Sequence, residues 1–277
     1  MGLKGKVAVV TGSTSGIGLG VARALASEGC AIMLNGFGDK ALIDKLQRDL
    51  AKEHDVRVSY SGADMSKPAE IGLMIAAAER ELGACDILVN NAGIQHVAPI
   101  EEFPDDKWDA IIAINLSAAF HATKAALPGM KKRRWGRIVN IASAHGLVAS
   151  AQKVGYVAAK HGLVGVTKVT AVECANDGIT CNAICPGWVL TPLVERQLAD
   201  RAKQTGRSMD ETKEEFLREK QPMLAFSTPE SIGALTVFLC SDAAATMTGS
   251  AYSIDGGWVA QEFASGREDR SATARGL

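Results

Sequence analysis

The sequence predicts a doubly wound α/β fold, in which one parallel seven-stranded sheet of the Rossmann type carries helices on both faces. The first observation is an alternation along the chain of short apolar runs, rich in β-branched residues, with longer stretches of helical pattern. The second is a glycine-rich turn, Gly12 to Gly18, at the first junction of strand and helix. Right-handed crossovers between parallel strands then place the helices on the two faces of a single sheet.

The alternation gives the expected elements in chain order. Buried parallel strands read as short, nearly continuous apolar runs, and we expect strands near residues 6–11, 31–35, 56–60, 86–90, 136–142, 179–185 and 251–254. Helices are expected near residues 16–28, 39–53, 67–82, 107–131, 156–176 and 229–241. With neither an internal repeat nor a linker in the sequence, these elements predict a single domain over residues 1–260.

Two segments depart from the alternation. Residues 191–225 are polar, charged and helical in pattern, and they follow Pro186-Gly187. Ligands of open α/β sheets bind beside the carboxyl ends of the strands, so we expect this insertion to act as a lid. Residues 261–277 are small, charged and without periodicity, and we interpret them as a polar C-terminal tail, mobile or left over from cloning.

Charge and cysteine usage exclude several classes of function. The 30 basic and 31 acidic residues give a formal net charge of −1, which favours neither nucleic acid nor an anionic membrane surface as a partner. No apolar run approaches the ~18–20 residues that span a bilayer, and residues 1–20 resemble a strand and turn rather than a signal peptide. The six cysteines form no C-x-x-C pair, so we expect reduced thiols, a cytoplasmic protein and no bound metal.

The glycine-rich turn predicts a dinucleotide site. Lys6 to Thr11 is the apolar run of a buried strand, and the turn after it leads directly into a helical stretch. Glycines at such a junction let the backbone approach a pyrophosphate, and the helix N-terminus supplies N–H donors and partial positive charge. The spacing is G-x-x-x-G-x-G rather than the commoner G-x-G-x-x-G, and the alternative is a tight turn without a ligand.

A second pattern predicts acid–base chemistry. Tyr156 and Lys160 are four residues apart, so on a helix they share one face, and Ser143 precedes them. An ammonium group beside a phenol favours the phenolate and lowers its pKa from about 10. With a serine hydroxyl on the same reacting oxygen, the set can move a proton on or off an alcohol or carbonyl. Alone, Tyr-x-x-x-Lys also arises by chance on many helices.

Together these motifs resemble the short-chain dehydrogenase/reductase family over roughly residues 4–258. The matching segments, in the family's order and approximate spacing, are TGSTSGIG at 11–18, NNAG at 90–93 and PG at 186–187, with Asn115, Ser143, Tyr156 and Lys160 between them. The resemblance implies the strand order 3-2-1-4-5-6-7 and an enzyme with a nicotinamide cofactor. It also implies a homotetramer assembled through the long helices near 107–131 and 156–176.

The resemblance assigns roles residue by residue. The implied catalytic residues are Ser143, Tyr156, Lys160 and Asn115, the last of which would hold a water that passes protons from Lys160 to solvent. From the residues alone, Asn115 could instead kink its apolar helix and bond to the backbone. Besides Tyr156 and Lys160, the implied cofactor-binding residues are Gly12, Thr14, Ser15, Gly16, Ile17, Gly18, Phe37, Asp64, Met65, Asn91, Ala92, Gly93, Pro186, Gly187, Val189 and Thr191.

The end of the second strand favours NAD. Dinucleotide sites place an acid there to hold the ribose of NAD, or an arginine to hold the phosphate of NADP. Here the segment is Asn35-Gly36-Phe37-Gly38-Asp39, with no acid at the strand tip and no cation in its place, and Phe37 could lie against adenosine. Asp64 and Asn91 have structural alternatives, as a helix cap and as a turn residue respectively.

Four further polar residues decide the predicted substrate. A lysine, a histidine and two amides suit a small carboxylate, and these are Lys153, His145, Gln95 and Gln197, with Trp188 and Trp258 as pocket walls. Each has a plain alternative as a surface, turn, loop or helix-face residue. The segments at 34–39, 90–96, 140–150 and 184–189 resemble family members that act on (R)-3-hydroxybutyrate.

The expected reaction is therefore NAD-dependent interconversion of (R)-3-hydroxybutyrate and acetoacetate. Substrate binding would involve Ser143 and Tyr156 as well as the residues named above. One alternative is an NADP-dependent reductase of 3-oxoacyl thioesters or sugars, whose substrates would leave Lys153 without a carboxylate. The other is a nucleotide-binding protein without turnover, against which the intact Ser143, Tyr156 and Lys160 argue.

Overall fold

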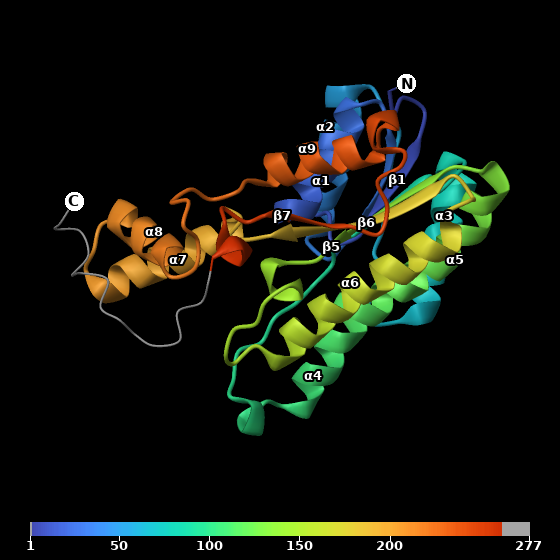
Figure 1. Ribbon diagram of the computed structural model, residues 1–277. Coiled ribbons are helices and arrows are strands. Elements are labelled where there is room, and N and C mark those ends of the chain that lie inside the picture. The colour runs from blue at the N-terminus through green and yellow to red at the C-terminus, as the bar shows by residue number, and fades with distance from the viewer. Residues whose placement is uncertain (1, 262–277) are drawn as a thin grey trace.

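The computed structural model describes residues 2–261, and a seven-stranded parallel sheet forms its centre (Figure 1). The strand order is β3-β2-β1-β4-β5-β6-β7, which confirms the predicted fold class and topology. The strands are β1 (Val7–Val10), β2 (Ala31–Asn35), β3 (Val58–Ser61), β4 (Ile87–Asn90), β5 (Gly136–Ile141), β6 (Ile179–Pro186) and β7 (Ala251–Ile254). The strand order changes direction between β1 and β4, where ligands of open α/β sheets bind.

Helices cover both faces of the sheet (Figure 1). One face carries α1 (Gly16–Ser27), α2 (Lys40–His54) and α9 (Pro229–Cys240). The other carries α3 (Pro68–Leu82), α5 (Ala118–Arg133) and α6 (Val154–Cys174). This arrangement matches the helices expected from the sequence, with ends that differ by a few residues.

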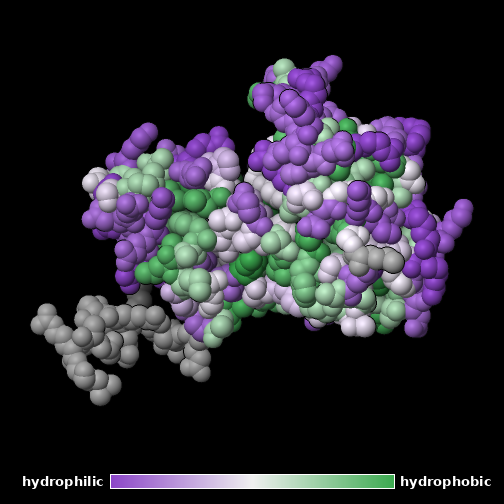
Figure 2. Space-filling model, turned by 90° about the horizontal axis from the view of Figure 1, so that it is seen from above, coloured by the Kyte–Doolittle hydropathy of each residue, from purple (hydrophilic) through white to green (hydrophobic). Residues whose placement is uncertain are grey.

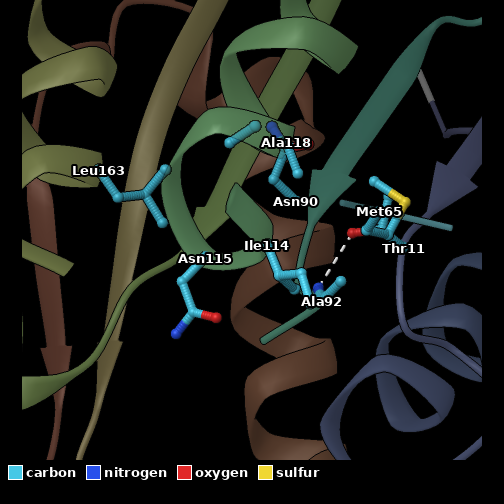
Figure 3. Close-up of a pocket in the computed structure, with 9 residues that line it drawn as sticks. Thr11, Met65, Asn90, Ala92, Ile114, Asn115, Ala118 and Leu163 are labelled. Carbon is cyan, nitrogen blue, oxygen red and sulfur yellow. Dashed lines mark hydrogen bonds between the residues drawn. The ribbon is translucent and has the colours of Figure 1, made fainter. Parts of the chain in front are cut away.

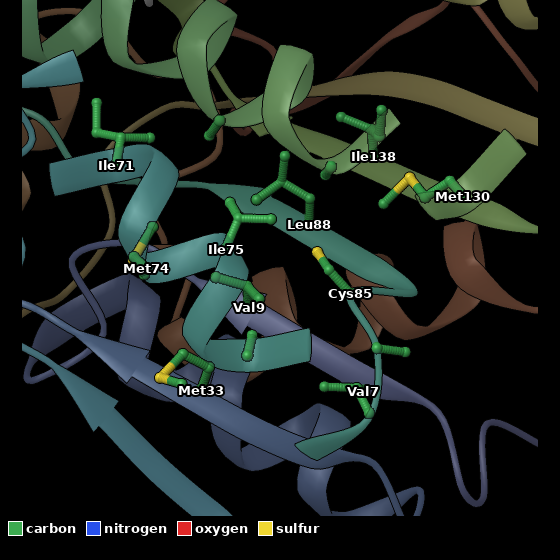
Figure 4. Close-up of a cluster of buried hydrophobic side chains, with 14 of the residues drawn as sticks. Val7, Val9, Met33, Ile71, Met74, Ile75, Cys85, Leu88, Met130 and Ile138 are labelled. Atoms are coloured by element: carbon green, nitrogen blue, oxygen red, sulfur yellow. The ribbon is translucent and has the colours of Figure 1, made fainter. Parts of the chain in front are cut away.

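The two faces of the sheet are covered by separate hydrophobic clusters. Successive residues of a strand point to opposite faces, so Val7 and Val9 of β1 join the cluster with α3 and α5, and Ala8 and Val10 join the cluster with α1 and α9. Figure 4 shows the first cluster, in which Met130 of α5 also takes part. Because all these strand residues are buried, the sheet is a fixed platform for the loops at its carboxyl end.

The long apolar stretch near 107–131 differs from the expected single helix. Helix α4 (Asp105–Ile112) continues through a π-helical turn (Ala113–Ser117) into α5. By length and composition alone, residues Asp105–Arg133 are long and apolar enough to cross a membrane, which the search for uninterrupted apolar runs in the sequence did not show. The stretch packs against α3 and α6 within the fold, and 39% of its most apolar window is buried there.

The insertion after β6 forms two helices that stand beside the sheet (Figure 1). These are α7 (Pro192–Thr205) and α8 (Met209–Arg218), which pack on each other. A parallel bridge between Val189 and Ser227 joins the segments on either side of the pair. In Figure 2 hydrophilic side chains cover the outside of this lobe, and hydrophobic ones lie on the side toward the main body. The predicted tail lies outside the described residues apart from Gln261.

Candidate active site

The turn between β1 and α1 depends on glycine at two close approaches. Gly12 has φ +63°, a left-handed conformation that glycine adopts without strain. At Gly18 a Cβ atom would lie 2.3 Å from the carbonyl oxygen of Gly12 and 2.5 Å from Asn91 Nδ2. Only glycine therefore lets the first turn of α1 pack against the loop that precedes it.

Asn35, at the end of β2, braces this loop from below. It is fully buried, its Oδ1 accepts from the Gly12 N–H at 3.2 Å, and its Nδ2 donates to the carbonyls of Ser61 and Ala63 at 3.1 and 2.9 Å. The Ser13 N–H donates to the Asn35 carbonyl at 2.6 Å. Both ends of the Asn35 amide are thus hydrogen-bonded within the protein. These bonds explain why position 35, at the end of β2, holds an amide and not an acid.

Asn91, after β4, holds the same loop from the other side. Its Nδ2 donates to the carbonyls of Thr11 and Gly12 at 2.9 and 3.1 Å. The Thr11 hydroxyl accepts from the N–H groups of Asn91 and Ala92 at 2.9 and 3.0 Å. The turn-residue interpretation of Asn91 is correct for its side chain, and its contact with a cofactor remains a prediction.

The resulting cradle suits the pyrophosphate of a dinucleotide. Helix α1 begins after Ser15, which makes no side-chain capping bond, and no acidic residue lies in its first turn. Its first N–H groups and the positive end of its dipole are therefore available to an anion. The glycines let a pyrophosphate come close to the backbone at this helix N-terminus, so these residues fit a nicotinamide dinucleotide.

Asn115 lies in the π-helical turn, where both ends of its amide bond to the backbone of Ile94. Oδ1 accepts from the Ile94 N–H at 2.8 Å, and Nδ2 donates to the Ile94 carbonyl at 2.9 Å. The residue is 2% exposed. Asn115 thus ties the helix to the loop after β4, as its structural alternative requires, and its role in proton transfer stays a prediction.

A small buried cavity lies behind this turn (Figure 3). Thr11, Asn90 and Asn115 supply its polar lining, and Met65 closes one side. Asn90 donates to Asn140 at 2.8 Å, but its Oδ1 has no partner within the described residues. Met65, predicted to bind the cofactor, therefore lines this inner cavity and not the large pocket described below.

Ser143, Tyr156 and Lys160 meet at the carboxyl end of β5. Ser143 follows the strand, and Tyr156 and Lys160 lie in the first two turns of α6 on the same face. The Lys160 ammonium donates to the Ile141 carbonyl at 2.7 Å and lies 5.5 Å from the centre of the Tyr156 ring. The structure thus brings together the three residues that the sequence pattern selected.

The electrostatics of this trio are set by burial. Burial lowers the pKa of Lys160 to about 8. It also raises the pKa of Tyr156 above its ordinary value, and a hydrogen bond with Ser143 opposes this shift. The net shift of the Tyr156 pKa is therefore upward, opposite to the lowering expected from Lys160, because desolvation of the buried phenol is its largest cause.

A pocket of about 880 Å³ opens above the trio, and it brings most of the predicted site residues together. The loops after β4, β5 and β6, the first turns of α1 and α6, and the lid line it. Predicted residues in its wall are Ile17, Asn91, Gly93, Gln95, Ser143, Lys153, Tyr156, Lys160, Pro186, Gly187, Trp188, Val189, Thr191 and Gln197. Of the remaining predicted residues, Met65, Ala92 and Asn115 line the small cavity described above, and the others line neither space.

One wall of the pocket carries positive charge. Lys153, which precedes α6, is half-buried with its ammonium 5.6 Å from the centre of the Trp188 ring. No carboxylate pairs with it within residues 2–261. Burial, followed by the charge of Lys220, lowers its pKa. A half-buried cation without a counter-ion favours an anionic ligand.

His145 stands behind this wall. It is 4% exposed, its Nε2 is 2.9 Å from Ser150 Oγ, and its ring meets those of Tyr156 and Trp258 edge-on at 5.9 and 5.0 Å. Burial and the nearby charge of Lys153 lower its pKa to about 4, so the ring is neutral near pH 7. A neutral imidazole ring can donate or accept a hydrogen bond, according to its tautomer.

The lid contributes residues that the sequence did not single out. Phe216 of α8 packs on Trp188 at 4.4 Å between ring centres and lines the pocket. Lys220, just after α8, lies near enough to lower the pKa of both His145 and Lys153. Phe216 could have been noticed in the sequence as an aromatic residue within a polar helix. Nothing in the sequence pattern distinguishes Lys220 from the other lysines of the lid.

Two predicted cofactor residues have structural roles of their own. Asp64 accepts from the Ser66 N–H and hydroxyl at 2.9 and 2.7 Å and so forms the turn before α3, close to its predicted alternative as a cap. Phe37 is 68% exposed at the open end of the cradle, where Thr14 donates to its carbonyl at 3.2 Å. Among residues 2–261 the only cation that pairs with either side chain is Lys67, whose Nζ lies 3.7 Å from Asp64 Oδ2.

Metal-ligand side chains do not cluster in the described part of the chain. Within residues 2–261 no three His, Cys, Asp or Glu side chains are placed to hold a metal ion.

The fold and the site define an oxidoreductase of the Rossmann type, and comparisons with known proteins agree. A family model described as Enoyl-(Acyl carrier protein) reductase matches residues 12–259. The chain belongs to the short-chain dehydrogenase/reductase family.

Relatives and solved structures match along nearly the whole chain. The D-beta-hydroxybutyrate dehydrogenase of Cupriavidus necator is 60% identical over 94% of this chain and 100% of its own length. The enzyme of the same name from Rhizobium meliloti is 52% identical over 92% of this chain and 99% of its own. The L-sorbose reductase of Gluconobacter frateurii, solved with NADPH and L-sorbose, superposes with a TM-score of 0.90 at 33% identity, over 95% of this chain and 99% of that one.

Proposed function

We propose that the protein is an NAD-dependent dehydrogenase that interconverts (R)-3-hydroxybutyrate and acetoacetate. The observation that carries this proposal is Lys153, a half-buried cation without an acidic partner in the described residues, in the same pocket as Ser143 and Tyr156. A carboxylate bound by Lys153 would place a short 3-hydroxy acid with its hydroxyl toward the trio. The two relatives named D-beta-hydroxybutyrate dehydrogenase support this substrate class.

The cofactor would lie along the cradle between α1 and the loop after β4. The glycines, Thr14 and Ser15 would hold the pyrophosphate, Asn91 to Gly93 the nicotinamide ribose, and Phe37, Asp64 and Met65 the adenosine end. Preference for NAD is supported by the segment Asn35 to Asp39, which offers no cation to a ribose phosphate; Asp39 instead caps α2 by accepting from the Leu42 N–H at 3.0 Å. When bound, NAD supplies the hydride acceptor, and NADH the donor.

The chain's own residues would handle the proton. During oxidation the Tyr156 phenolate would take the proton of the substrate hydroxyl and become the neutral phenol, and during reduction the neutral phenol would give that proton to the substrate oxygen. Ser143 donates to the same substrate oxygen and holds it against Tyr156. Lys160 keeps positive charge beneath the phenol and bonds to the cofactor ribose, and Asn115 keeps the adjacent turn in place. Gln95, His145 and Gln197 complete the polar surroundings of the carboxylate, with Trp188 and Trp258 beside its alkyl chain.

A spectrophotometric assay tests the proposal. Purified protein is mixed with (R)- or (S)-3-hydroxybutyrate and with NAD or NADP, and reduced cofactor is followed by absorbance. We expect turnover with the (R) acid and NAD, little with the (S) acid, and a higher kcat/KM with NAD than with NADP. Faster reduction of a 3-oxoacyl thioester or of a sugar with NADPH would favour the other enzyme class instead. The absence of turnover on every substrate, with cofactor binding intact, would favour a non-catalytic nucleotide-binding protein.

We further propose a cytoplasmic homotetramer in which residues 1–260 form one domain. All six cysteines are free and buried, as suits a reducing compartment. A groove of about 710 Å³ between α5 and α6 is lined largely by apolar side chains, among them Phe120 and Val169, which are 49% and 58% exposed. Such a face is typical of a subunit contact. Light scattering should give the mass of four chains and a smaller mass for Val169→Glu; a monomeric wild type would disprove the assembly.

A further inference from the structure

Gln221 is a buried amide at the end of the lid that has no part in the reaction described above. It follows α8 and is 1% exposed. Its Oε1 accepts from the Trp188 N–H at 3.2 Å, and its Nε2 donates to the carbonyls of Met223 and Ala225. Both ends of the amide are therefore bonded, and the acceptor end is bonded to a residue of the pocket wall.

Two glycines make room for this side chain. A Cβ atom at Gly187 would lie 2.7 Å from Gln221 Oε1, and one at Gly256 would lie 2.6 Å from Gln221 Cγ. Gly187 follows β6 and Gly256 follows β7, where its φ is +58°. The Met223 N–H also donates to the Gly256 carbonyl at 2.9 Å. The end of the lid is thus inserted between the carboxyl ends of the last two strands.

Trp188 connects this point to the substrate pocket. Its N–H donates to Gln221 at the end of the lid, and its carbonyl accepts from the Ser227 N–H, just after the lid, at 3.0 Å, so both backbone polar groups are bonded. Its indole ring packs on Phe216 and on Trp258, with ring centres 4.4 and 5.6 Å away. The ammonium of Lys153 lies over the same ring. A shift of Trp188 would therefore move the surface on which that cation rests.

We propose that Gln221 is a positioning residue for substrate recognition, which fixes Trp188 under the Lys153 ammonium and joins the lid to the pocket wall. The proposal rests on the proposed function for its substrate, but the geometry of Trp188 can be measured without one. Ser143 follows β5, and Tyr156 and Lys160 lie on α6, whereas Gln221 lies between the ends of β6 and β7. Gly187 is also held independently, since its N–H donates to the Ile254 carbonyl at 3.1 Å. Gln221 should therefore affect substrate binding more than turnover or cofactor binding.

The kinetic test uses Gln221→Met, which keeps the length of the side chain and removes its hydrogen bonds. We expect KM for (R)-3-hydroxybutyrate to rise about 3- to 10-fold, the range for a lost neutral hydrogen bond, with kcat and the Kd for NAD within about twofold. Thr212→Val is the matched control, because the buried Thr212 hydroxyl donates to the Ser208 carbonyl within α8 and does not touch Trp188. Its KM should stay at the wild-type value. An equal rise in the control would mean that any disturbance of the lid suffices, and the proposal would fail.

A double-mutant cycle and a fluorescence measurement complete the test. If Gln221 acts through Trp188, Gln221→Met combined with Trp188→Ala should bind substrate no worse than Trp188→Ala alone. If the double variant instead loses affinity by the product of the two single losses, the proposal is overturned. In protein with Trp108→Phe and Trp135→Phe, only Trp188 and Trp258 remain to emit. Acrylamide quenching of their emission should increase in Gln221→Met and not in Thr212→Val. This readout needs no substrate, so unchanged quenching refutes the Gln221 role even if the enzyme acts on another compound.

Discussion

The residues proposed for chemistry on the sheet side and Gln197, the predicted substrate residue on the lid, differ in how firmly their side chains are held. On the sheet side, Ser143, Lys160 and Asn115 are 8%, 4% and 2% exposed, and each has a hydrogen-bond partner in the protein. On the lid side, Gln197 of α7 is exposed and forms no hydrogen bond within the described residues. The groups proposed for chemistry are thus placed before any ligand binds, whereas the lid amide gains its partner only from a ligand.

This difference follows from how firmly each side is attached to the sheet. The trio stands on β5 and α6, whose backbone is fixed by the sheet and by two buried clusters. The lid is joined to the body through the Val189–Ser227 bridge, the Trp188–Phe216 contact and Gln221. Changes on the sheet side should therefore cost turnover or strong binding, and changes on the lid side should cost less.

The largest effect is expected for Tyr156→Phe, which keeps the ring and deletes the hydroxyl. Loss of a positioned general acid or base lowers the rate about 10²- to 10⁴-fold. NAD binding should survive, because the cradle between α1 and the loop after β4 is untouched. Steady-state kinetics and cofactor titration measure the two quantities separately. Turnover near that of the wild type would show that Tyr156 does not transfer the proton, and the sheet side would then not be the side on which turnover depends.

The second-largest effect is expected for Lys153→Ala. Lys153 lies on the sheet side of the pocket, but its proposed role is to bind the substrate and not to move a proton. A lost hydrogen bond to a charged group is worth about 1.5–3 kcal/mol, or roughly 10- to 150-fold in kcat/KM. The loss should appear mainly in KM, and it should be much smaller for a 3-hydroxybutyrate ester. Lys203→Ala, an exposed lysine of α7, is the control and should leave both substrates unaffected. Equal losses on acid and ester would indicate damage to α6 instead of a carboxylate site.

A stability measurement tests whether the wall behind Lys153 is as rigid as the trio. The pKa of His145 falls from 6.5 to about 4 through burial and then the charge of Lys153. The unfolded chain therefore binds a proton in this pH range that the folded protein does not, so His145 lowers stability as pH falls from about 6.5 toward 4. By pH 5 the wild type should lose roughly 2 kcal/mol from this group. Urea unfolding at pH 7.5 and 5 should show a smaller loss in His145→Gln; the same loss in both proteins would mean that the ring is accessible to water.

The sequence predicted the sheet side well because its signals are local. Strands, the glycine turn and the Tyr156–Lys160 spacing depend on periodicity within a few residues, and the structure places each where expected. Asn35 and Asn91 were harder, because their side chains bond to strands and loops that are distant in sequence. Their position after a strand could be seen, but the fact that the protein itself satisfies them could not.

The lid side was predicted less completely. The pattern of residues 191–225 indicated helices, but it could not show that Phe216 faces the pocket or that Lys220 approaches Lys153. Gln221 had no signal at all, since a glutamine after a polar helix is ordinarily solvated. For Asn115 the sequence offered a kink bonded to the backbone as one alternative, but the π-helical form of the turn and its partner Ile94 depend on bonds across the fold.

The smallest effect is expected for Gln197→Ala on the lid. Gln197 lines the pocket but is exposed and unbonded in this conformation, so its removal leaves no buried group without a partner. A neutral hydrogen bond to the substrate contributes about 0.5–1.5 kcal/mol, and KM should therefore rise only about 2- to 10-fold, with kcat nearly unchanged. Gln204→Ala, an exposed glutamine further along α7, should have no effect on KM. A loss for Gln197→Ala as large as that for Lys153→Ala would show that the bound state holds the lid as firmly as the sheet side, and that the difference between the two sides exists only without substrate.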